Sequence, residues 1–99
     1  LGRAAGLDLP TLLAAIGGGA AGSWMLSNLA PRMVDGDWAP GFRVVLQQKD
    51  LRLALESAQA SLVPLPGTAL VQQLFRAAEA RGWGDEGTQS LYKVIADLD

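Results

Sequence analysis

The residues with the clearest chemical potential in this 99-residue sequence are an adjacent lysine and aspartate, Lys49 and Asp50. They lie within "GFRVVLQQKDLRLALESA", the stretch from Gly41 to Ala58, which is otherwise typical of a helix. With about 3.6 residues per turn, Lys49 shares a face with Leu46 and Leu53, and neither charge has an oppositely charged residue three or four positions away. Because an unpaired charge on an apolar face is costly, both side chains need distant partners or a ligand.

Two interpretations of these charges remain open from the pattern alone. In the first, Lys49 extends its four-carbon stem to solvent, and Asp50 pairs with a distant arginine such as Arg3 or Arg32. In the second, both charges border a ligand cleft, and Phe42, two turns earlier on the same face, forms an apolar wall.

The composition excludes several other kinds of chemistry. The sequence has no Cys and no His, so it has no thiolate zinc site and no Ser-His or Cys-His nucleophile, and we expect no metal site. Its net charge of −2 and scattered basic residues argue against a nucleic-acid partner.

Two short motifs resemble functional sites by their letters only. The "GGGAAG" of Gly17 to Gly22 fits a G-x-G-x-x-G dinucleotide fingerprint, but we expect a helix before it where that fingerprint needs a strand. We interpret these glycines as a break between two closely packed helices. Asp35 and Asp37 flank Gly36, a pattern more typical of a turn than of a carboxylate dyad.

Helical elements account for most of the chain, because Ala and Leu dominate while Ile and Thr are scarce. We expect Leu1 to Ala5 to be the last turn of a helix that begins earlier. The first predicted helix runs from an Asp8 cap to the triple glycine, and the second starts near Ala20 to Ser23 and continues through Pro31 and Met33. The third runs from about Phe42 to Leu62. The fourth starts at Pro66 and is closed by Gly82 and Gly84, and the last runs from a cap at Asp85 or Thr88 through Leu98. The third helix is apolar on both sides, which predicts a central position with neighbours in two directions.

The uncharged stretch from Leu9 to Pro31 raises the question of a membrane span. Its 23 residues include Gly17 to Gly19 and Pro31, so a buried helical hairpin is the better interpretation. We expect no membrane partner, no signal peptide and a cytoplasmic location.

The stretch "PGFRVVLQQKDLRLALESA", Pro40 to Ala58, resembles the cofactor-binding signature of the β-hydroxyacid dehydrogenases, the family of 3-hydroxyisobutyrate dehydrogenase and 2-hydroxy-3-oxopropionate (tartronate semialdehyde) reductase. Similar stretches at Ala4–Asp8, Gly17–Asn28 and Leu65–Gly87 extend the resemblance over nearly the whole chain. It implies an all-α, 6-phosphogluconate-dehydrogenase-C-terminal-like helical domain of about five helices. In this family an N-terminal Rossmann domain binds NAD or NADP, and the active site lies between the two domains.

By this resemblance, Lys49 would contact the nicotinamide cofactor, and Phe42 and Asp50 would line or organise the pocket for substrate and nicotinamide. Ser23 and Asn28 are weaker candidates, since packing and backbone hydrogen bonds explain them as well. The implied reaction is hydride transfer between NAD(P) and a small semialdehyde or hydroxy acid. The implied partners are the protein's own Rossmann domain and further copies of the chain in a homo-oligomer.

The sequence also departs from the family. The glycine fingerprint, the Ser-Gly-Gly substrate loop and the catalytic lysine with its nearby asparagine have no counterpart here; that lysine would fall upstream of Leu1. Lys93 lies in the wrong place to replace it, and Arg52 stands where the family usually has a small or uncharged residue. We therefore expect residues 1–99 to be a C-terminal helical domain that is inactive alone. A non-enzymatic helical interaction module, or an imine or sulfolactaldehyde reductase of the same architecture, are the alternatives.

Overall fold

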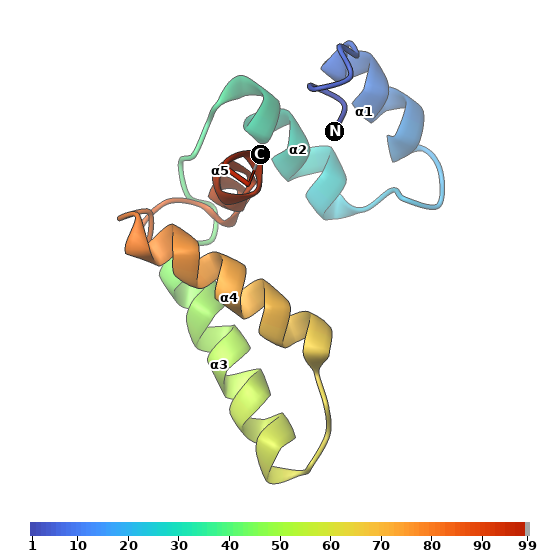
Figure 1. Cartoon of the computed structure of the whole chain (residues 1–99). Coiled ribbons are helices and arrows are strands. Elements are labelled where there is room, and N and C mark those ends of the chain that lie inside the picture. The colour runs from blue at the N-terminus through green and yellow to red at the C-terminus, as the bar shows by residue number, and fades with distance from the viewer. Residues whose placement is uncertain (99) are drawn as a thin grey trace. The chain divides into compact units, whose positions relative to one another are not determined.

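The computed structural model describes residues 1–98, which form five α-helices and one 3₁₀ helix and contain no β-strand (Figure 1). The helices are α1 (Leu9–Gly17), α2 (Trp24–Asp35), α3 (Val44–Ala60), α4 (Pro66–Ala80), η1 (Thr88–Ser90) and α5 (Leu91–Ala96). The prediction of an all-α fold is confirmed. The chain divides into two compact units, Leu1–Asp37 with α1 and α2, and a second unit from Trp38 onward.

The first unit begins with a single helical turn. The Ala5 amide donates to the Leu1 carbonyl at 2.9 Å, and the Leu7 amide donates to the Gly2 carbonyl at 3.0 Å. Gly6 has a left-handed φ of 73°, as is usual for the residue that ends a helix. Leu1 to Ala5 thus forms a hydrogen-bonded turn, and the expectation that it ends an earlier helix stays a prediction.

Side-chain caps begin both helices of this unit. Asp8 accepts a hydrogen bond from the Thr11 amide at 3.2 Å, and Ser23 accepts one from the Leu26 amide at 2.9 Å. These bonds satisfy amides that a helix leaves without partners in its first turn, so both predicted helix starts are confirmed.

Glycines shape the ends of α1 and α2. A Cβ at Gly22 would lie 2.4 Å from the Gly17 carbonyl oxygen, so the turn between the helices closes only with glycine there. The preceding element is the helix α1, which rejects the dinucleotide interpretation of this motif. Gly36 ends α2 with a φ of 68°, and Arg32 pairs with Asp37 at 3.0 Å, as expected of a turn.

The second unit is built on a hairpin of α3 and α4 (Figure 1). Its core consists of Val44, Phe75, Ala78 and Val94, all buried, with Leu51 packed against them. Burial of these side chains holds α3, α4 and α5 together, since apolar burial is the dominant stabilising contribution in a small domain.

The structure differs from three predictions about this unit. The third helix is present but begins two residues after Phe42 and ends two residues before Leu62, which has a φ of 56°. Its packed face meets α4, η1 and Val94 of α5, whereas Leu46 and Leu53 on the other face are 39% and 48% exposed among the described residues, so the expected second set of neighbours is not seen there. Neither Asp85 nor Thr88 caps the last helix; η1 follows Gly87 without a side-chain cap and continues into α5.

No helix within residues 1–98 is both long and apolar enough to cross a bilayer.

Candidate functional site

The first turn of α3 is fixed by the loop that follows α4. The Val44 amide donates to the Glu86 carbonyl at 2.9 Å, and the Val45 amide donates to the Gly84 carbonyl at 3.0 Å. The Thr88 amide donates to the Phe42 carbonyl at 2.9 Å. Carbonyls of this loop therefore accept hydrogen bonds from the first amides of α3. Together with the bond from Thr88, they fix where α3 starts and where Phe42 lies.

Two glycines allow this close approach. A Cβ at Gly84 would lie 2.9 Å from Val45 Cγ1, and a Cβ at Gly87 would lie 2.2 Å from the Gln89 side-chain oxygen. Gln89 is 1% exposed, and its side-chain amide donates to the Ala39 carbonyl at 2.9 Å. The loop from 84 to 89 thus acts as a packed support for α3.

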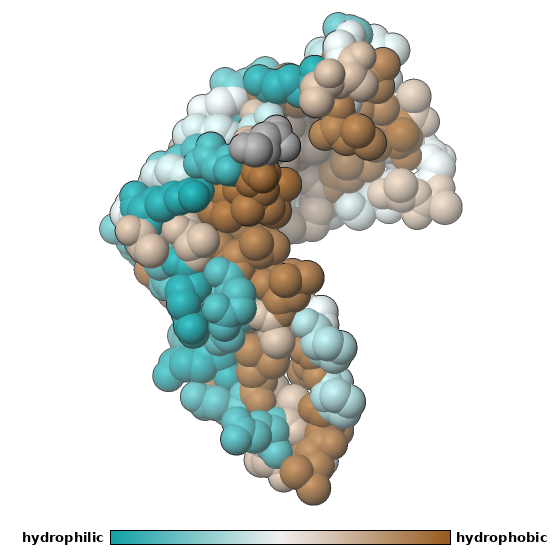
Figure 2. All heavy atoms as spheres, in the orientation of Figure 1, coloured by the Kyte–Doolittle hydropathy of each residue, from teal (hydrophilic) through white to brown (hydrophobic). Residues whose placement is uncertain are grey.

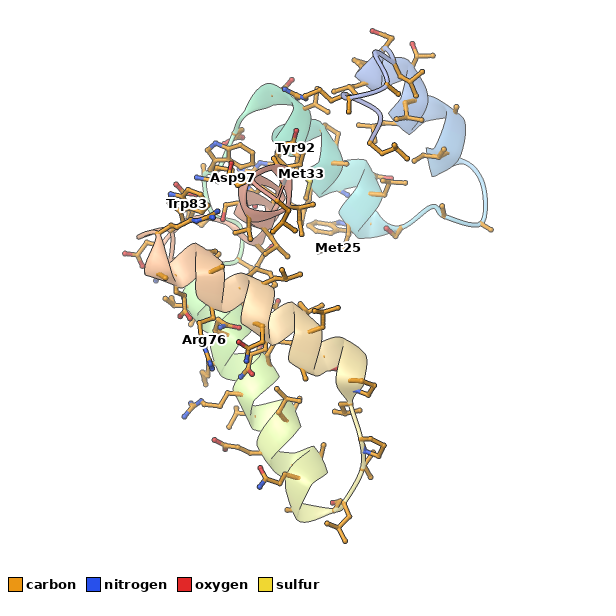
Figure 3. All side chains as sticks on the ribbon, in the orientation of Figure 1. Met25, Met33, Arg76, Trp83, Tyr92 and Asp97 are labelled. Carbon is orange, nitrogen blue, oxygen red and sulfur yellow. The ribbon has the colours of Figure 1, made fainter. Side chains whose placement is uncertain are left out.

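A cluster around Lys93 fixes the same loop to α5. The Lys93 ammonium lies 2.6 Å from Glu86 Oε2, 3.9 Å from the centroid of the Trp83 ring and 5.1 Å from that of Trp38. Trp38 stacks on Tyr92, with ring centroids 6.1 Å apart (Figure 3 labels Trp83 and Tyr92). Lys93 thus lies between two indoles and connects the segment before α3, which carries Trp38, to the segment after α4, which carries Trp83.

The predicted site residues of the second unit lie on or next to α3. Phe42 lies just before the helix with 42% of its surface exposed, so it is not on the helix face as predicted. Lys49 and Asp50 are both exposed, and no ion pair among residues 1–98 involves either of them. Arg32, one of the arginines considered as a partner of Asp50, pairs with Asp37 within the first unit.

Lys49 lies at a pocket between α3 and α4. The pocket has a volume of about 300 Å³ and is lined by Val45, Gln48, Lys49 and Arg52 from α3 and by Gln72, Arg76 and Glu79 from α4. Figure 3 shows Arg76 on α4 at this part of the hairpin. Phe42 and Asp50 are not among its lining residues. Lys49 therefore shares the pocket with two arginines, Arg52 and Arg76, and not with the other predicted site residues.

Gln48 connects the two walls of this pocket. Its side-chain amide donates to the Gln72 carbonyl at 3.3 Å and to the Glu79 carboxylate at 3.1 Å. Glu79 is the one acid in the lining, and its described partner is this neutral amide. The lining carries three cations and one carboxylate, a local net charge of +2.

Comparison with known proteins identifies the family. A family profile described as "NAD-binding of NADP-dependent 3-hydroxyisobutyrate dehydrogenase" matches residues 1–95. The chain belongs to this family. The relationship predicted from the motif around Lys49 and Asp50 is therefore confirmed, and NAD(P) is the cofactor of the family.

Individual relatives agree with this assignment. The chain is 46% identical over 89 residues to the uncharacterized oxidoreductase YkwC of Bacillus subtilis, covering 90% of this chain and 31% of that protein. It is 44% identical over 91 residues to 2-hydroxy-3-oxopropionate reductase of Escherichia coli, covering 92% of this chain and 31% of that protein. The chain spans about a third of the length of these relatives.

A solved structure supports the fold of this family member. The chain aligns with the crystal structure of 3-hydroxyisobutyrate dehydrogenase from Salmonella typhimurium with a TM-score of 0.87 and 31% identity. The alignment covers 94% of this chain and 33% of that one. The helical fold predicted from the family resemblance is confirmed.

The two weaker candidates of the dehydrogenase resemblance have local structural roles in the first unit. Ser23 caps α2, and the Asn28 side-chain amide donates to the Trp24 carbonyl at 2.9 Å, one turn earlier. Both bonds lie within or at the end of one helix. They explain why these polar residues occur in α2 without reference to a ligand.

Sequence reasoning missed five of the residues that share the pocket with Lys49. Val45 and Gln48 lie within one turn before it, but Gln72, Arg76 and Glu79 lie on α4, more than 20 residues along the chain. In the sequence, Arg52 stands out only as a departure from the family. The sequence signal for these residues is the periodic apolar face of the fourth helix. This face predicts that the helix packs on a neighbour, but it does not predict which part of α3 it contacts.

Proposed function

We propose that this chain is the C-terminal helical domain of an NAD(P)-dependent β-hydroxyacid dehydrogenase, in which it forms part of the cofactor and substrate cleft and part of the subunit interface. The observation that carries the proposal is the family match over residues 1–95, together with a helical fold that covers 33% of a solved 3-hydroxyisobutyrate dehydrogenase. On this proposal the Rossmann domain and the catalytic lysine helix are supplied by the remainder of a longer protein. The reaction is hydride transfer between nicotinamide and a small semialdehyde acid.

The residues around the start of α3 fit such a cofactor. Lys49 is an exposed ammonium with no ion pair within residues 1–98, so it is available to an anionic group. Phe42 exposes 42% of its surface next to the 84–88 loop, to which its carbonyl is hydrogen-bonded, and this exposed aromatic surface suits contact with a flat ring. Asp50 is an exposed carboxylate that can accept a hydrogen bond from a hydroxyl or an ammonium.

When bound, the nicotinamide supplies or accepts the hydride. Lys49 binds and orients an anionic group of the cofactor, and Phe42 excludes water from one side of the ring. Asp50 holds a neighbouring donor in place by a charge-assisted hydrogen bond. By family resemblance, the proton for the developing alkoxide comes from the lysine of the interdomain helix, which residues 1–99 do not contain. We therefore expect no dehydrogenase activity from this chain alone.

Apolar surface on α3 supports a role in domain or subunit contacts. Leu46, Leu53 and Val45 are 39%, 48% and 38% exposed in this chain, on a helix whose other face is well packed. A covering domain or a second copy would remove this surface from water and stabilise the assembly. Ser23 and Asn28 keep only the structural roles described above in this proposal.

The first test is to assay the full-length protein for reversible NADH- or NADPH-dependent reduction of small semialdehyde acids, with the 99-residue chain assayed beside it. We expect activity from the full-length protein and none from the 99-residue chain. A folded full-length protein that transfers no hydride to any of these acids would reject the dehydrogenase proposal and favour an interaction module.

The second test is Lys49→Ala in the full-length protein. Loss of one charge-assisted contact of about 1.5–3 kcal/mol should raise the KM for NAD(P) by about tenfold or more. Arg81→Gln is a matched control, because it removes an exposed cation that pairs with Asp97. If Lys49→Ala has the cofactor KM and kcat of the wild type, Lys49 does not contact the cofactor.

The third test is Asp50→Asn, which keeps the shape of the side chain and removes its charge. We expect a lower kcat, because the hydrogen-bonding network at the nicotinamide loses its charged acceptor. Unchanged kinetics would mean that Asp50 has no part in the site.

A further inference from the structure

The eight basic side chains of this protein differ in whether they have a partner. Within residues 1–98, four of them pair with carboxylates: Arg32 with Asp37, Arg43 with Asp85, Arg81 with Asp97 and Lys93 with Glu86. Arg3 donates a hydrogen bond to the Val34 carbonyl. The other three, Lys49, Arg52 and Arg76, have no described ion pair, and all three line the pocket between α3 and α4.

This grouping costs stability unless something neutralises it. Lys49 and Arg52 lie three residues apart on α3, so their like charges are neighbours on one helix face. Arg76 adds a third cation from α4. Glu79, the one acid in the lining, accepts a hydrogen bond from Gln48, and it lies within 4.0 Å of none of the three cations' nitrogen atoms. Glu56, one turn after Arg52 on α3, lies outside the lining and forms no ion pair among residues 1–98. The residues that line the pocket therefore carry a charge of +2 on a chain whose net charge is −2.

Hydrogen bonds between α3 and α4 hold the two walls of the pocket together, so that charges on both helices can contact one ligand. The Gln48 amide fixes α3 to α4 by bonds to the Gln72 carbonyl and the Glu79 carboxylate. Figure 2 shows a hydrophilic band along one side of the α3–α4 hairpin. Two guanidinium groups and an ammonium on two packed helices can bind one ligand from different directions, and each guanidinium can bind two oxygen atoms in parallel.

We propose that Lys49, Arg52 and Arg76 form a binding site for an oxyanion of charge near −2, such as a phosphate group or the second carboxylate of a dicarboxylic hydroxy acid. A ligand with this charge would neutralise the pocket, whereas a single carboxylate would leave one positive charge in excess. The site itself rests on the geometry of α3 and α4. Only the assignment of the ligand to the substrate rests on the proposed dehydrogenase function.

The test measures binding of inorganic phosphate to the full-length protein by titration calorimetry. We expect saturable binding that weakens by about tenfold or more in Arg76→Gln and in Arg52→Gln, since each change removes a charge-assisted hydrogen bond. Arg81→Gln, which removes a cation elsewhere, should bind phosphate as the wild type does. Absent binding, or equal weakening in all three variants, would overturn the site. Both pocket arginines are exposed, so the variants should fold, and thermal midpoints verify this.

Steady-state kinetics then separate the two sources of the ligand. If the substrate carries the second charge, Arg76→Gln raises the KM for dicarboxylic hydroxy acids by about tenfold and leaves the KM for monocarboxylic ones unchanged. If the anion is a phosphate group of the cofactor to which we assign Lys49, Arg76→Gln raises the KM for NAD(P) instead. If phosphate is a separate ligand, the KM values for the acids and for NAD(P) stay unchanged while phosphate binding is lost. A full-length protein that binds phosphate but transfers no hydride would reject the proposed function and keep the site. An active enzyme that does not bind phosphate would support the proposed function and reject the anion site.

Discussion

The cluster around Lys93 makes a strong prediction about stability. Lys93→Met keeps the length and most of the volume of the side chain but removes its charge. The side chain is only 21% exposed, and its ammonium lies 3.9 Å and 5.1 Å from the centroids of two tryptophan rings and 2.6 Å from Glu86. The variant therefore loses two cation–π contacts and leaves a half-buried carboxylate unpaired.

The magnitude follows from these contacts. Cation–π contacts are worth about 0.5–1 kcal/mol at exposed sites and about 2 kcal/mol when desolvated, and the nearer ring dominates here. A charge-assisted hydrogen bond adds about 1.5–3 kcal/mol, reduced by the remaining solvent exposure of both partners. Contacts between the new sulfur and the rings offset a part of this loss. We expect Lys93→Met to lower the free energy of unfolding by about 2 kcal/mol.

Urea denaturation of the 99-residue chain, followed by tryptophan fluorescence, measures this change. For a chain of this size, about 2 kcal/mol corresponds to a fall of roughly 10 °C in the thermal midpoint. Lys93→Arg is the matched control, because it keeps the cation and should lose less than about 1 kcal/mol. A double-mutant cycle with Glu86→Gln isolates the ion pair. A Lys93→Met protein within about 0.5 kcal/mol of the wild type would refute the role assigned to this cation.

Three further changes test other parts of the fold. Gly87→Ala should lower the free energy of unfolding by about 1–3 kcal/mol, because the new Cβ would lie 2.2 Å from the Gln89 side chain. Gly67→Ala is the control, since a Cβ there meets no atom within 4 Å and should cost nothing. Equal effects of the two changes would contradict this contact. Ser23→Ala should cost about 1 kcal/mol through loss of the α2 cap, measured by the same denaturation, and an unchanged midpoint would argue against the cap. Leu53→Gln should change the stability of the 99-residue chain by less than about 0.5 kcal/mol, since the side chain is 48% exposed; a large loss would show that it is covered.

Local signals in the sequence predicted most helix boundaries. Asp8 and Ser23 cap their helices because a side-chain oxygen reaches an amide only three residues away, a contact set by local backbone geometry. Gly36 and Gly82 end helices with φ of 68° and 83°, a conformation that glycine adopts without steric cost. The start of α3 was misjudged for the opposite reason. Its first amides bond to carbonyls of residues 84 and 86, about 40 positions along the chain.

The sequence by itself determined the helical class, the family resemblance and the identity of Lys49, Asp50 and Phe42 as candidates, since each depends on residue type and short-range spacing. Only the tertiary structure decided what surrounds Lys49. The packing of α3 on α4 brings Arg76 and Glu79 to Lys49, leaves Leu53 exposed, and places Lys93 between two indoles. Such meetings depend on how whole helices pack, because the side chains involved are far apart in sequence and no local pattern encodes their contact.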